Sequence, residues 1–158
     1  MGLRWTNEEV EMPEIHGTID IARSVEDVFD YLKEPKNNVE WEKAAVVMEM
    51  TSEGPMGVGS KGRRVEKNPG MGTDEGNWEI TQFEENKIIE MGFESDKFVG
   101  DGAWELESAN GATRLSYRFR GETTSFLFKL LMPLMMPVMK RMIRKDYGRL
   151  KEILESQS

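Results

Sequence analysis

Residues able to do covalent or acid–base chemistry are scarce in this chain of 158 residues. It has no cysteine and a single histidine, His16. The absence of cysteine excludes thiolate nucleophiles, disulfides, zinc fingers and iron–sulfur clusters, and one histidine cannot form a multi-histidine metal site or a histidine relay. His16 could act as a general base, since the imidazole pKa lies near neutrality. Because it alternates with Ile15 in an extended segment, an exposed strand histidine is favoured. We expect no catalytic residue, no metal site and no cofactor.

A glycine pattern suggests, at first sight, a nucleotide-binding loop. The sequence Gly57-Val-Gly-Ser-Lys-Gly62 has the spacing of the G-x-G-x-x-G fingerprint. That fingerprint holds a pyrophosphate only when a strand precedes it and a helix follows it, so that the ligand meets a helix N-terminus. Here Arg63-Arg64-Val65-Glu66 continues as a strand. A turn followed by a strand is therefore favoured over a nucleotide site.

Several charged residues lie in alternating segments where their direction decides their role. Glu79, Glu105 and Glu107 alternate with tryptophans and a leucine, so they face water if the tryptophans face inward. An acid–base pair of these carboxylates inside a cavity is the less favoured alternative. Arg64 and Ser60 could both point inward. Arg64 would then either hold a carboxylate or phosphate of a ligand, or form an ion pair with Glu66 or Glu79.

The elements that would position these residues can be predicted from periodicity. Ile15, Ile19 and Ile21 alternate with polar residues, as in a strand. Ser24 begins a capping box, which predicts a helix over residues 25–33, and residues 35–40 could form a second short helix. Six alternating segments separated by turn sequences then fill residues 44–121, which predicts an antiparallel meander.

The apolar face of such a sheet must be covered by the last segment of the chain. One apolar stripe with helical spacing runs through it: Met135, Met139, Ile143, Tyr147, Leu150 and Leu154. Pro133 suits a first helical turn and Pro137 would interrupt a helix, so we expect a start near Leu134 or a kink. A bent sheet and a straight helix cannot touch everywhere, so we expect a cavity between them.

Composition narrows the class and the location. The formal net charge is −8, which disfavours a nucleic-acid reader. Residues 1–12 have no apolar region of the kind found in secretory signals, and the apolar stretch 126–143 is interrupted by charges and prolines, so we predict a cytoplasmic protein. The basic run Lys140–Lys151 follows Phe126–Pro133 and could make transient contact with an anionic membrane surface; a solvated helix face is the alternative.

Four sequence pieces resemble the helix-grip superfamily, also called START-like or SRPBCC, which includes the polyketide cyclase/dehydrase and lipid-transport families. The first is Ile19-Asp-Ile-Ala-Arg-Ser-Val-Glu-Asp-Val-Phe29, and the second is Trp41. The third is Trp78-Glu-Ile-Thr-Gln-Phe83 with Lys87-Ile88. The fourth is the hairpin from Gly102 to Leu115, in which Ala112 stands as an extra residue between glycine and threonine. The resemblance covers about residues 13–156.

This resemblance implies an α+β helix-grip fold: a seven-stranded antiparallel curved sheet around a long C-terminal helix, with two short helices between strands 1 and 2. It implies one START-like ligand-binding domain over residues 1–158, a monomer or weak homodimer, that carries or sequesters a small hydrophobic ligand such as a lipid or polyketide-like aromatic. The alternatives are a polyketide cyclase/dehydrase-type enzyme using the same pocket, and a protein-interaction or stress-response module. The segment 68–76 would be a mobile gate. The candidate ligand-binding residues are Met48, Met50, Arg64, Trp78, Met91, Phe93, Trp104, Tyr117, Phe119, Met135 and Met139.

Overall fold

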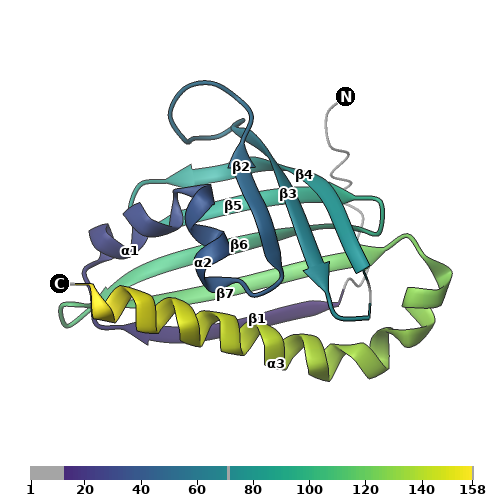
Figure 1. Ribbon diagram of the computed structural model, residues 1–158. Coiled ribbons are helices and arrows are strands. Elements are labelled where there is room, and N and C mark those ends of the chain that lie inside the picture. Colours follow the sequence, from purple (N-terminus) through teal and green to yellow (C-terminus); the bar gives the residue numbers. More distant parts are fainter. Residues whose placement is uncertain (1–12, 71, 158) are drawn as a thin grey trace.

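The computed structural model describes residues 13–70 and 72–157 and shows a curved antiparallel sheet with a long helix across it (Figure 1). The strands are β1 (Glu14–Ile21), β2 (Ala45–Met50), β3 (Lys61–Asn68), β4 (Gly72–Glu84), β5 (Ile88–Ser95), β6 (Phe98–Ala109) and β7 (Ala112–Thr123). The helices are α1 (Val25–Leu32), the 3₁₀ turn η1 (Pro35–Asn37), α2 (Asn38–Trp41) and α3 (Phe126–Ser156). The predicted fold class and order of elements are confirmed.

The sheet order is β1-β7-β6-β5-β4-β3-β2, so strands β2 to β7 form the expected meander and β1 closes on β7. Turn chemistry sets the register locally. Asn110 and Gly111 have φ of 54° and 81°, and both positive values are needed for a two-residue hairpin of the primed type, here closed by the pair Ala109 and Ala112. At the start of α1, the Ser24 side chain accepts a hydrogen bond from the Asp27 backbone N–H at 3.2 Å, as the capping box predicts.

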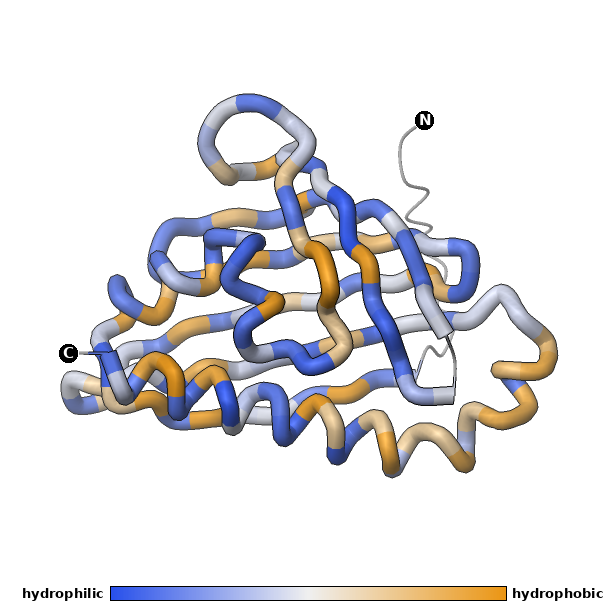
Figure 2. The backbone as a smooth tube through the Cα atoms, viewed as in Figure 1, coloured by the Kyte–Doolittle hydropathy of each residue, from blue (hydrophilic) through white to orange (hydrophobic). Residues whose placement is uncertain are grey.

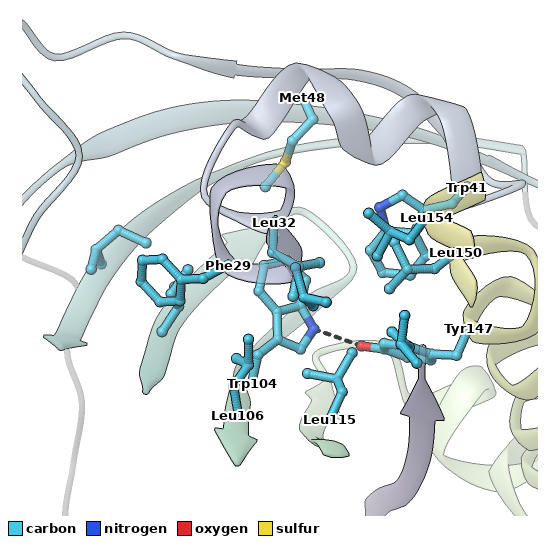
Figure 3. Packing of buried hydrophobic residues seen from close by; sticks show 14 of the residues in the cluster. Phe29, Leu32, Trp41, Met48, Trp104, Leu106, Leu115, Tyr147, Leu150 and Leu154 are labelled. Atoms are coloured by element: carbon cyan, nitrogen blue, oxygen red, sulfur yellow. Dashed lines mark hydrogen bonds between the residues drawn. The ribbon is translucent and has the colours of Figure 1, made fainter. Parts of the chain in front are cut away.

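The hydrophobic core lies where α1, α2 and the second half of α3 meet the middle of the sheet. Figure 3 shows Trp41, Leu150 and Leu154 packing from the helices against Trp104 and Leu115 of the sheet. Trp41, Trp78, Phe29 and Leu115 are at most 2% exposed. The polar faces of the strands point outward, so the amphipathic alternation of the sequence decides which face of the sheet carries the core.

Of the two expectations for helix α3, the kinked helix is correct and the start near Leu134 is wrong. Its N-cap is Ser125, and Pro133 and Pro137 lie inside it rather than at its start. Proline removes a backbone donor and its ring clashes with the preceding turn, which bends a helix rather than always ending it. Figure 1 shows α3 changing direction in this proline-containing first half. The buried residues of α3, Tyr147, Leu150 and Leu154, all lie in the second half.

Three further expectations concern a membrane-spanning helix, a secretory signal and the gate segment. No helix in the part of the chain that the structure describes is long and apolar enough to cross a membrane. The expectation of a missing secretory signal falls on residues 1–12, outside the described residues. In the predicted gate, Met71 also lies outside them, while Asn68 ends β3 and Gly72 begins β4. The gate segment is thus largely the β3–β4 hairpin and the beginning of β4, a long strand of 13 residues.

Candidate functional site

The predicted lining residues fall into two groups by depth. Met48, Trp78 and Trp104 are 3%, 1% and 9% exposed and belong to the core. Phe119 is exposed. The other predicted lining residues are half-buried: Met50, Arg64, Met91, Phe93, Tyr117, Met135 and Met139. Trp78, Phe93 and Phe119 lie on one face because Trp78 is paired with Phe93 across β4 and β5 and Phe119 stacks on Phe93. The inner face therefore has a closed, buried part and an open, half-exposed part.

The closed part contains a small hollow. An internal chamber of about 10 Å³, room for roughly one water molecule, is lined by Asn38, Met48, Trp78, Met91 and Trp104, among others. Large side chains occupy the space that the bent sheet leaves beneath the helices. Trp41 lies with its ring centroid 6.1 Å from that of Trp104 and 5.0 Å from that of Tyr147. This hollow is thus far smaller than a ligand cavity, which typically measures hundreds of Å³.

Two residues that line this chamber each carry a buried polar atom without a hydrogen-bond partner. Asn38 is 1% exposed, and among the described residues its Oδ1 and the Nε1 of Trp78 have no partner. Both residues line the chamber. The other end of the Asn38 amide is engaged, because Nδ2 donates to Glu42 Oε1 at 2.7 Å. A buried acceptor and a buried donor that are left unpaired each cost free energy.

An aromatic cluster joins α3 to the sheet beside this chamber. Trp104 Nε1 donates to Tyr147 Oη at 2.7 Å (Figure 3). The Tyr147 ring stacks on Tyr117 with centroids 3.8 Å apart. Burial raises the pKa of the Tyr147 hydroxyl well above its ordinary value, since the phenolate would be desolvated. Tyr147 is therefore a neutral hydroxyl that accepts from tryptophan. It is a structural contact at the border between the closed and open parts.

The open part of the inner face consists of aromatic rings over glycines. Phe93 and Phe119 stack with centroids 5.1 Å apart and planes 14° from parallel. Gly100 and Gly121 lie beneath them: a methyl group at Gly100 would come within 2.7 Å of the Phe93 ring. Because glycine has no side chain, the two rings can lie directly against the backbone of the sheet. The apolar stripe of α3 continues from Tyr147 back through Met139 and Met135, which are only half-buried.

Arg64 points inward and is held by carboxylates. It donates to Glu66 through Nε at 2.6 Å and pairs through Nη2 with both Glu66 and Glu42. The ion pair with Glu66 is one of the alternatives that the sequence left open; the pair with Glu42 was not foreseen. Burial raises the pKa of the Glu42 carboxyl, against the opposing effect of Arg64. The two carboxylates keep the pKa of Arg64 above its ordinary value despite burial. The guanidinium is thus occupied by the protein itself.

The remaining candidates take the simpler roles. The side chain of His16 is 75% exposed and lies 3.5 Å from Glu14, on the rim of an open, polar hollow of about 230 Å³ on the outer face. The Gly57–Gly62 segment runs directly into β3, so the fingerprint lacks its helix and the nucleotide interpretation is wrong. Ser60 is buried and its Oγ accepts from the Gly57 backbone N–H at 3.0 Å, which fixes this turn.

The three glutamates face away from the buried tryptophans of their strands. Glu105 and Glu107 are exposed and Glu79 is half-exposed, whereas Trp78 and Trp104 are buried. The preferred outward orientation is therefore confirmed. Within residues 13–70 and 72–157, no three His, Asp or Glu side chains are close enough to hold a metal ion.

The parts of the site that depend on register were not predicted from the sequence. Asn38, Glu42 and the glycines Gly100 and Gly121 were not singled out. The sequence did contain a signal for Gly100: Gly100, Gly102 and Trp104 occupy every second position of β6 and so lie on the same face. No comparable signal marked Glu42, because its partner Arg64 is 22 residues away in the sequence.

The inner face of the sheet, the crossing helix and the two short helices define a helix-grip protein. The family model described as "Polyketide cyclase / dehydrase and lipid transport" matches residues 12–155. The chain therefore belongs to the polyketide cyclase/dehydrase and lipid transport family. A search of curated proteins returns no match.

Solved structures agree on the fold. A similar structure is TTHA0849 from Thermus thermophilus, with a TM-score of 0.78 and 19% identity over 92% of this chain and 99% of that one. A START superfamily protein from Mycobacterium smegmatis gives a TM-score of 0.67 and 15% sequence identity, over 91% of this chain and 95% of that one. DynU16, described as a putative protein in the dynemicin biosynthetic locus, gives 0.64 and 16% over 90% of this chain and 47% of that one.

Proposed function

We propose that this protein binds a small hydrophobic ligand, such as a lipid or a polyketide-like aromatic, against the open part of the inner face. The observation that carries the proposal is the Phe93–Phe119 stack. Phe119 is 37% exposed although it points to the same side as the fully buried Leu115. Water-exposed apolar surface on the inner side of a fold is stabilised when a ligand covers it, at about 25 cal/mol per Å² buried.

The helix opposite supports an adaptable contact. Met135 and Met139 continue the buried stripe of α3 by helical spacing, and both are half-buried. Methionine is unbranched and flexible, so it can follow ligands of different shapes. The description of the family names polyketide chemistry and lipid transport, and both involve largely apolar molecules that would suit such a surface.

A polar end of the ligand would be recognised at the small chamber. Trp78 Nε1 offers a donor and Asn38 Oδ1 an acceptor, and a hydroxyl group satisfies both. The chamber of about 10 Å³ has room for a single oxygen atom rather than a ring. We propose a ligand whose apolar body lies over Phe93 and Phe119 and whose polar end reaches this chamber after a rearrangement of Met91, which lines it.

Binding is proposed here rather than catalysis. A cyclase- or dehydrase-type enzyme needs an acid or base that is free to meet its substrate. Glu42 is the buried carboxylate of this region, but its Oε1 accepts from Asn38 and its Oε2 pairs with Arg64. Its protonation state is therefore tied to the ion network of the protein.

A direct test is titration with cis-parinaric acid, a fluorescent fatty acid, competed by unlabelled palmitate or anthraquinone. We expect saturable binding at one site per chain and at least ten-fold weaker binding by Phe119→Ser. Val46→Ser is the matched control, since Val46 is 48% exposed on β2. Absence of saturable binding with either class of probe, or equal weakening by both variants, would contradict the proposal.

A further inference from the structure

The first half of α3 exposes apolar side chains on more than one side. Phe126, Leu130 and Leu134 are 81%, 67% and 76% exposed, and Val138 is 60% exposed. Figure 2 shows this apolar segment at the end of the molecule where α3 leaves the sheet. Its opposite side carries the Met135 and Met139 stripe, so these leucines are a second apolar surface and do not belong to the proposed ligand site. We call residues 126–145 the docking segment.

The exposed surface changes from apolar to basic along one line of the helix. Residues three and four apart share a helix face, and all six of the following are exposed: Leu127, Leu131, Leu134, Val138, Arg141 and Lys145. Lys140 and Arg144 flank the same end and are also exposed. An apolar stretch followed at once by a basic one is the arrangement of helices that lie at a membrane interface.

Charge separates this segment from the rest of the chain. Residues 126–145 contain five basic residues and no acidic one, in a chain whose formal net charge is −8. Lys129 is paired at 3.5 Å with Glu122, the acidic group that faces the start of the helix. For Lys140, Arg141, Arg144 and Lys145, no ion pair is found within the described part of the chain, and Asp146 is taken by Arg149 at 2.9 Å. These cations are available to an anionic partner.

We propose that the docking segment binds the surface of an anionic lipid bilayer, with the leucines and Phe126 at the acyl boundary and the basic turns at the headgroups. The segment lies on the membrane, since no described helix can span it. A symmetric dimer through this surface would bury the leucines but leave the basic turns without an acidic partner in the facing segment, because residues 126–145 contain no acidic residue. A nucleic acid would pair with the cations but leave the leucines exposed to water.

The test is co-sedimentation with vesicles of phosphatidylcholine alone or with a quarter of phosphatidylglycerol, without added ligand, so that it is independent of the ligand proposal. We expect binding to the anionic vesicles, at least ten-fold weaker binding to neutral ones, and loss of binding at high salt. Lys140→Gln/Arg141→Gln should weaken binding about 30-fold, at roughly five-fold per charge. The matched control is Lys36→Gln/Lys67→Gln, two lysines exposed elsewhere.

Insertion of the apolar side chains is tested separately. Because the chain has no cysteine, a single Leu130→Cys labelled with an environment-sensitive dye reports on this position. We expect a blue shift with anionic vesicles, and none for Val58→Cys in the β2–β3 loop, where Val58 is 70% exposed. Leu130→Ser/Leu134→Ser should weaken binding at least ten-fold without loss of fold.

Several results would overturn the proposal. These are no vesicle binding, equal binding to neutral and anionic vesicles, or equal effects of the test and control variants. A molar mass in solution twice that of the chain, abolished by Leu134→Ser and unaccompanied by vesicle binding, would assign the surface to a second copy instead.

Discussion

Trp104 of β6 donates a hydrogen bond from its indole N–H to the hydroxyl of Tyr147 of α3 at 2.7 Å, and both side chains are buried. This contact links the middle of the sheet to the helix over a separation of 43 residues. Tyr147 also stacks on Tyr117 of β7. The residue therefore fixes α3 against two neighbouring strands, at the point beyond which the helix is no longer buried.

Removing the Tyr147 hydroxyl should be costly although the ring remains. Tyr147→Phe leaves the Trp104 N–H unsatisfied in the core, which typically costs about 1–3 kcal/mol of unfolding free energy. Tyr117→Phe is the matched control, since the structure gives the Tyr117 hydroxyl no hydrogen bond within the described residues; its effect should stay below about 0.5 kcal/mol. Urea unfolding measures both. Equal losses would show that the hydrogen bond is not the stabilising element.

Two glycines on the same face of β6 should respond differently to alanine. At Gly100, an added Cβ would lie 2.1 Å from the Arg120 carbonyl oxygen and 2.7 Å from the Phe93 ring. At Gly102, the nearest atom would be at an ordinary 3.5 Å. Gly100→Ala should therefore destabilise by about 1–3 kcal/mol or more, as overpacking does, and Gly102→Ala should change stability by less than about 0.5 kcal/mol. Thermal unfolding of the pair would refute this if the order were reversed.

The Glu42 carboxyl should give stability a distinctive pH dependence. Burial raises its pKa in the folded protein above the usual 4.5, so folding takes up a proton at this group. Its contribution to stability is fully present below the unfolded pKa and is lost as the pH rises through the raised folded pKa. Glu42→Gln lacks this titration and keeps the contact with Asn38.

The variant should therefore gain stability relative to the wild type as the pH rises from about 4 to about 8, as measured by urea unfolding at each pH. Glu53→Gln, exposed in the β2–β3 loop, controls for the loss of one negative charge. If the unfolding free energy of Glu42→Gln instead fell relative to the wild type with rising pH, the ion pair with Arg64 would outweigh the effect of burial on the Glu42 pKa.

Hydrogen exchange should divide α3 into two parts. Residues 126–139 are largely exposed and contain Pro133 and Pro137, whereas Tyr147, Leu150 and Leu154 anchor the second half in the core. Local opening is easiest where few apolar side chains are buried. Peptides from the first half should exchange faster by at least ten-fold, as measured by mass spectrometry, and anionic vesicles should slow them. Uniform protection along the helix would contradict this division.

Much of the fold could be predicted because local signals were consistent. The alternation at Ile15, Ile19 and Ile21, the cap at Ser24 and the turn at Asn110 each depend on neighbouring residues. The start of α3 could not be predicted in this way. By local rules Pro133 and Pro137 allow either a helix start near Leu134 or a kink, and only the tertiary structure shows that the helix continues through them with a bend.

For the candidate site, the available chemistry could be read from the residues alone: no thiol, one histidine, and an aromatic and methionine set with helical and strand periodicity. Which of these residues fill the core and which stay open depends on long-range packing and could not be predicted. Trp78 and Trp104 line a hollow of about 10 Å³, while Phe93 and Phe119 remain accessible above glycines of the neighbouring strands. Likewise, Arg64 and Glu42 are 22 residues apart in the sequence, and the register of β3 and the position of α2 bring them together. Periodicity predicts which face of an element a side chain lies on, whereas long-range packing determines which residues lie opposite it.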